Sequence, residues 1–225
     1  MKIKDLEKLE EKIDRDFSWR KVELLQIKMA IEKNNVSLSK KTLVRSGIAL
    51  LCAHWEGFIR SVSNYYVVYI CCQKIQSKYL KENFLAFKIK QDVRKSGESS
   101  KNSVHTKFLL RIVDLQEEIF SIRFSDIPEK RIINTDSNLS FELFDEILKS
   151  IGLENIYETK RNYIDNEMLK YRHEIVHGES YRDTEYDFTE VYHQVMSIME
   201  SFKFQVIEAA EEKKYLKKIE GSATI

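Results

Sequence analysis

Helix-breaking residues are scarce in this chain of 225 residues, which has one proline and six glycines. So few breakers favour long, uninterrupted helices. No G-x-G-x-x-G or G-x-x-x-x-G-K-[S/T] pattern is present, which excludes the glycine-rich loops of dinucleotide-binding and P-loop proteins. No apolar run reaches the roughly 18 residues that a membrane-spanning helix needs, and the N-terminus is charged and lacks the features of a secretory signal.

A charge excess of one sign is also missing, since 37 Lys and Arg face 36 Asp and Glu for a net charge of +1. Contact with nucleic acid therefore requires a local basic patch, because the chain has no strong overall field. The three cysteines, Cys52, Cys71 and Cys72, lie in apolar helix-like sequence and are typical of reduced core residues. We expect a soluble, cytoplasmic protein without a metal, a cofactor or contact with a membrane.

Apolar residues recur at steps of three, four and seven over most of the chain. This spacing predicts helices over 4–33, 104–120 and 156–177. Residues 40–80 are apolar on most sides, so we expect a helix at the centre of a bundle or in an interface. The sequence therefore predicts an all-α fold, an antiparallel bundle of about five to seven helices with two long core helices.

Several residues mark predicted helix ends. Ser140 is suited to cap the N-terminus of a helix that ends at Gly152, and Gly178 is suited to follow the C-terminus of the 156–177 helix. Asp187 and Glu190 match a capping box that opens a final helix reaching about residue 219.

We expect a single domain over residues 1–225. Its serine-rich stretch at about 90–103 is predicted to be a flexible loop, and about 211–225 a charged, solvated tail.

The segment YRHEIVHGE contains two overlapping patterns, of which the first is HEIVH. His173 and His177 are four residues apart, so on one helix they can share a zinc ion while Glu174 activates water. A catalytic zinc also needs a third protein ligand, and Ser180 and Asp183 occupy the Gly and His positions of the extended zinc motif. A zinc peptidase is therefore the least favoured interpretation.

The second pattern is R-x4-H, from Arg172 to His177. A guanidinium can grip phosphate oxygens, and an imidazole can move a proton near neutral pH, so the pair is suited to chemistry on one phosphate. The structural alternative is that Arg172 pairs with Glu167 or Asp165, while His177 only caps a helix C-terminus.

This motif at the end of an amphipathic helix resembles the HEPN superfamily, whose domains carry R-x(4–6)-H. Arg45 followed by GIALLCAHWEGFIRSVSNYYVVYI, together with IDNEMLKYRHEIVHGE, is similar to the MAE-like HEPN subfamily. The resemblance covers about residues 5–210. It implies that Arg172 and His177 are the motif pair and that His173 is the polar residue after the arginine.

The resemblance also implies a function. HEPN proteins typically dimerise, so that two motifs face each other, and many are metal-independent ribonucleases. We therefore expect an endoribonuclease with RNA as substrate, formed as a homodimer, and acting as the toxin or effector of a bacterial toxin–antitoxin or anti-phage system with a possible antitoxin partner. The alternative is a non-catalytic HEPN dimer that binds RNA, nucleotide or protein.

Other residues are expected to support this site. Three glutamates near the motif or on the central helix are candidates for positioning roles, for example by orienting Arg172: Glu174, Glu179 and Glu56. A basic stretch with little opposing charge is expected to position an RNA backbone: Lys88, Lys90, Arg94 and Lys95.

Overall fold

The computed structural model describes residues 2–122, 133, 135, 138–179 and 187–218. These residues form helices and contain no extended strand, which confirms the predicted all-α class. The α-helices are α1 (Leu6–Lys33), α2 (Ser37–Cys72), α3 (Glu82–Gly97), α4 (Asn102–Glu117), α5 (Phe141–Ser150), α6 (Leu169–Val176) and α7 (Phe188–Glu211). Shorter turns are the 3-10 helices η1 (Ser77–Tyr79) and η4 (Glu158–Lys160) and the π-helix η5 (Tyr163–Met168).

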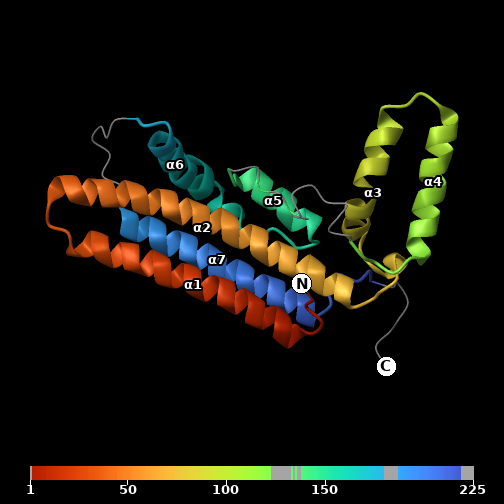
Figure 1. The fold of residues 1–225 in the computed structure, drawn as a ribbon, viewed down its shortest axis with the longest axis horizontal. Helices are drawn as coiled ribbons and strands as arrows, with labels where there is room; N and C mark the ends of the chain where they lie inside the picture. Colours follow the sequence, from red (N-terminus) through yellow and green to blue (C-terminus); the bar gives the residue numbers. More distant parts are fainter. Residues whose placement is uncertain (1, 123–132, 134, 136–137, 180–186, 219–225) are drawn as a thin grey trace.

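The helices are arranged around α2. Helices α1, α2 and α7 pack against one another along their length, while α5 and α6 lie on the other side of α2 (Figure 1). Helices α3 and α4 form a hairpin that projects from one end of this assembly (Figure 1). Because α2 has neighbours on both sides, its apolar sequence is explained by burial, as predicted.

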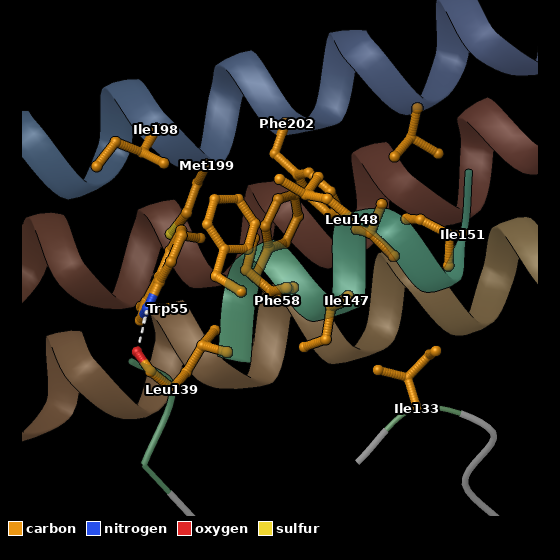
Figure 2. Close-up of a cluster of buried hydrophobic side chains, with 14 of the residues drawn as sticks. Trp55, Phe58, Ile133, Leu139, Ile147, Leu148, Ile151, Ile198, Met199 and Phe202 are labelled. Atoms are coloured by element: carbon orange, nitrogen blue, oxygen red, sulfur yellow. Dashed lines mark hydrogen bonds between the residues drawn. The ribbon is translucent and has the colours of Figure 1, made fainter. Parts of the chain in front are cut away.

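A cluster of aromatic rings joins the two sides of α2 (Figure 2). The ring of Trp55 lies 5.0 Å from that of Phe144 on α5, which in turn lies 5.8 Å from Phe202 on α7. The indole Nε1 of Trp55 donates to the carbonyl of Leu139, at 3.5 Å. Since large buried rings contribute strongly to core packing, this cluster fixes α5 and the residues before it against α2.

The predicted caps at the starts of α5 and α7 and the predicted glycine after α5 are confirmed. Ser140 Oγ accepts a hydrogen bond from the backbone amide of Leu143 at the start of α5. Gly152, which follows α5, has a φ of +73°, a conformation that glycine adopts without strain. Asp187 caps α7 by accepting from the amides of Thr189 and Glu190.

The predicted loop at about 90–103 is wrong in its extent. Helix α3 continues to Gly97 and α4 begins at Asn102, so only residues 98–101 connect them. His105 Nε2 donates to the carbonyls of Ser96 and Ser99 across this connection. The serines suggested a loop, but the preceding lysines, glutamine and arginine favour a helix.

The final helix also ends earlier than predicted, at Glu211. Lys213 has a φ of +52° and turns the chain back. Tyr215 is then only 2% exposed and lies against Tyr66 and Tyr69. Within the predicted solvated tail, residues 211–214 are exposed as expected, whereas Tyr215 packs on the core. The last residues of the tail lie outside the described part of the chain.

The described helices include none with the length and apolarity that crossing a membrane requires. The three cysteines carry free thiols, as predicted, with Cys52 buried and Cys71 and Cys72 half-buried.

We expect the stability of the fold to be sensitive to a larger side chain at Gly47, where α1, α2 and α7 meet. A Cβ there would lie 2.7 Å from the buried ring of Phe188 and 3.2 Å from Ile31, whereas a Cβ at Gly97 would meet nothing within 4 Å. Gly97 is the last residue of α3, so Ala gains less helix propensity there than in the interior of α2. The clash at Gly47 is expected to outweigh that gain, so Gly47→Ala should lower the free energy of unfolding by about 1–2 kcal/mol relative to Gly97→Ala. Urea unfolding followed by circular dichroism tests this, and equal midpoints for the two variants would contradict the packing described.

Candidate functional site

The π-helix η5 fixes the start of the motif helix. A carboxylate oxygen of Asp165 accepts from the first backbone amide of α5, at 2.8 Å, and the hydroxyl of Tyr163 donates to the carbonyl of Val191 on α7, at 3.1 Å. The thiol of Cys52 on α2 lies 3.8 Å from the carbonyl of Met168. Three neighbouring helices therefore hold η5, and α6 continues from it toward the surface with no fully buried residue. π-Helical turns are frequent at functional sites.

The other end of α6 is closed by a glycine turn. Gly178 has a φ of +68°, and its amide donates to the carbonyl of Ile175. The amide of Glu179 donates to the carbonyl of Glu174. These two bonds are those of a Schellman motif, so the predicted role of Gly178 is confirmed, and His177 is the last residue before the turn.

The two histidines of the motif lie together on the surface. The ring centroids of His173 and His177 are 4.2 Å apart, and the rings are tilted by 51°. Both residues are exposed, and Val176 between them is 64% exposed. The imidazole of His177 is thus accessible to a large substrate.

Arg172 has a different environment, since it is half-buried and its Nη1 donates to Oδ1 of Asn138, at 2.5 Å. Asn138 lies just before the cap of α5 and was not identified from the sequence. Because the two residues are 34 positions apart, no local spacing rule links them. The two residues of the R-x4-H pair thus have different neighbours, Asn138 for Arg172 and His173 for His177.

The charges of Arg172 and Glu56 both influence the buried thiol of Cys52. Burial raises the pKa of the Cys52 thiol to about 12; the positive charge of Arg172 opposes this shift and the negative charge of Glu56 adds to it. Both predicted residues are therefore within electrostatic reach of the same position on α2.

Glu56 also holds the segment before α5. Its Oε1 accepts from the hydroxyl of Thr135, at 2.8 Å, and from Nη1 of Arg60, at 3.3 Å. Thr135 in turn offers its carbonyl to the amide of Asn138, at 3.2 Å. Glu56 is thus connected to the partner of Arg172 through this segment.

A comparison with known families is consistent with this geometry. The family model described as RiboL-PSP-HEPN matches residues 15–208, a span that includes every residue of the candidate site. The chain belongs to the RiboL-PSP-HEPN family. No curated protein and no solved structure matches it. The family match supports the predicted HEPN superfamily, whose domains are often ribonucleases, often bind RNA and often dimerise. The MAE-like subfamily stays a prediction.

In this HEPN chain, the predicted RNA-positioning residues lie away from the motif helix. Lys88 forms an ion pair with Glu118, at 2.8 Å, and Arg94 with Glu98, at 2.9 Å, so the expectation of little opposing charge is wrong for these two residues. They lie on α3 rather than in a loop, and α3 is at the opposite end of the molecule from α6 (Figure 1). Within one chain the structure therefore does not bring the motif together with the predicted RNA-positioning residues, of which two more are exposed: Lys90 and Lys95.

For the HEIVH pattern, the neighbouring rings of His173 and His177 supply two possible metal ligands. Across the described residues, however, no three His, Cys, Asp or Glu side chains come together in a way that could hold a metal ion. Ser180 and Asp183 lie outside these residues. The described part of the chain does not supply the third ligand that a catalytic zinc needs.

His54, two residues before Glu56, belongs to a buried polar network on α2. It is 4% exposed, its Nδ1 accepts from Arg20 Nη1 at 3.2 Å, and its Nε2 lies 2.6 Å from a carboxylate oxygen of Glu23. Burial lowers the pKa of His54, and the charge of Arg20 adds to this effect, while Glu23 opposes it.

This network predicts a pH dependence of stability. Because the pKa of His54 is lower when folded, the unfolded chain binds the extra proton first, and stability falls as the pH drops below about 6.5. We expect the free energy of unfolding to decrease between pH 7.5 and pH 5.5, and to decrease less in His54→Gln. Urea unfolding at both pH values tests this, and an identical pH dependence in the variant would exclude His54 as the cause.

Proposed function

We propose that this chain is a metal-independent endoribonuclease whose active site forms between two copies. The observation that carries the proposal is the form of α6, which presents His177 to solvent at a glycine-closed helix end while Arg172 is held by Asn138. Membership of a HEPN family supports RNA as the substrate.

The proposed reaction is an attack by the ribose 2′-oxygen on the adjacent phosphorus. His177 of one chain removes the 2′-hydroxyl proton, and His177 of the second chain donates a proton to the departing 5′-oxygen. The P–O5′ bond breaks as the new P–O2′ bond forms, so the products are a 2′,3′-cyclic phosphate and a 5′-hydroxyl. Arg172 of each chain stabilises the additional negative charge on the phosphate oxygens.

In a two-fold symmetric dimer, the second chain supplies the second imidazole that the proposed reaction needs. The proposed reaction needs one His177 as base and another as acid, and an interface in which the same surface of both subunits meets provides two copies of each group. His173 is proposed to hold the His177 ring by the contact already described, and Glu56 to support Arg172 through Asn138.

The family resemblance extends the proposal to a biological setting, in which the enzyme is the toxin or effector of a bacterial toxin–antitoxin or anti-phage system, acts in the cytoplasm and is restrained by an antitoxin. The alternative is a HEPN dimer that binds RNA, nucleotide or protein without catalysis.

Digestion of RNA in EDTA, with analysis of the product ends, tests the proposal. Wild-type protein is expected to yield 2′,3′-cyclic phosphate ends. His177→Ala is expected to reduce the rate by about 10²–10⁴-fold through loss of acid–base catalysis, and Arg172→Ala by about 10²–10³-fold through loss of charge stabilisation. His105→Ala, an exposed histidine on α4, is the matched control and should retain full activity.

Three results would contradict this function. Products with 3′-hydroxyl ends would exclude attack by the 2′-oxygen, and full activity of His177→Ala would exclude its role. RNA binding that is strong in the wild type and weakened in Arg172→Ala, without cleavage, would identify the non-catalytic module.

A further inference from the structure

Helix α4 carries more apolar side chains than the fold covers. Only Leu115 on this helix is buried. In contrast, Leu109, Leu110 and Val113 are 62%, 59% and 63% exposed. A solvent-facing helix normally has its apolar residues on one side only, so packing within the described part of the chain does not explain this second set.

These side chains form one surface. Successive residues turn by about 100° on a helix, so Leu110 and Val113 lie on the side of α4 opposite Leu115, with Leu109 at its edge. We call these three residues the outer face of α4. In the described part of the chain α4 packs mainly against α3 and η1, and the hairpin projects from the helical body (Figure 1).

Polar contacts hold the hairpin in shape. Besides the bonds of His105 across the connection, Lys88 on α3 and Arg111 on α4 both pair with Glu118. Hydrogen bonds from Arg111 and then from Lys88 lower the pKa of Glu118 to about 2. The outer face is therefore presented on a supported helix and not on a loose segment.

Charges beside the outer face indicate what covers it. Lys107 and Asp114 are exposed and seven residues apart, so they lie on the same flank of α4, about 10 Å apart along its axis. When two copies of such a helix pack antiparallel, the same flanks meet, and the lysine of each copy lies opposite the aspartate of the other. In a parallel pair, this flank would instead face the opposite flank of the other helix, so the lysine and the aspartate would not meet.

We propose that the outer face of α4 is a self-association surface, where α4 packs antiparallel against α4 of a second copy around a two-fold axis. Leu110 of each copy then lies against Val113 of the other, and the two Lys107–Asp114 pairs flank this apolar centre. The surface pairs with itself, as a two-fold interface requires.

This contact is separate from the two-chain active site proposed above. The hairpin and α6 lie at opposite ends of the molecule (Figure 1), so association through α4 neither forms nor blocks that site. The inference therefore does not depend on ribonuclease activity.

Charge reversal tests the antiparallel pairing in the full-length protein. In Lys107→Asp or Asp114→Lys, like charges face each other, and the association constant from sedimentation equilibrium is expected to fall at least about tenfold. The double variant Lys107→Asp/Asp114→Lys exchanges the two charges and should recover the wild-type constant. Leu110→Glu should remove this association step and lower the weight-average mass at equilibrium.

Ile156→Glu is the matched control, because Ile156 is 59% exposed and lies outside the hairpin, and it should leave the association constant unchanged. Circular dichroism confirms that each variant is folded. Unchanged association in Leu110→Glu and in both single reversals would overturn the proposal, and so would a double variant that associates no better than the single ones.

Discussion

The burial of α2 between two layers of helices is the constraint on which the candidate site depends. Trp55 and the aromatic rings of α5 and α7 fix one part of this packing, and the contact of Cys52 with η5 fixes the other. Because α6 continues directly from η5, its direction is set by the core although α6 itself has no fully buried residue. The position of the motif is thus set by the packing of η5, which precedes α6, against the core.

In the proposed reaction, the two motif residues meet different requirements of phosphate chemistry. Arg172 is half-buried and held by Asn138, which limits the reorganisation that a charge-stabilising group undergoes during reaction. His177 is exposed beside His173, where an imidazole can reach a large substrate and exchange protons with it. This division is consistent with a site that is completed by a second copy of the chain.

Local rules predicted much of this structure. Helical periodicity indicated the all-α class, and single residues at helix ends, such as Ser140, Gly178 and Asp187, have the roles that their chemistry suggests. These features depend on a few neighbouring residues, so they can be read from a short stretch of sequence.

The features that were missed depend on distant contacts. Asn138 reaches Arg172 across 34 positions, and Tyr215 is buried because the chain turns back onto Tyr66. The 90–103 stretch was assigned to a loop from its serines, although ion pairs such as Lys88–Glu118 hold it within a helical hairpin. Composition alone does not report such long-range pairs.

The central claim is that one His177 from each of two chains acts on the same phosphodiester. Co-refolding wild-type chains with His177→Ala chains at equal amounts, followed by a cleavage assay, tests it directly. If both histidines are required, only dimers of two wild-type chains are active, and activity falls to about a quarter of the all-wild-type value. A fall to about one half would show that each chain acts alone and would contradict the composite site.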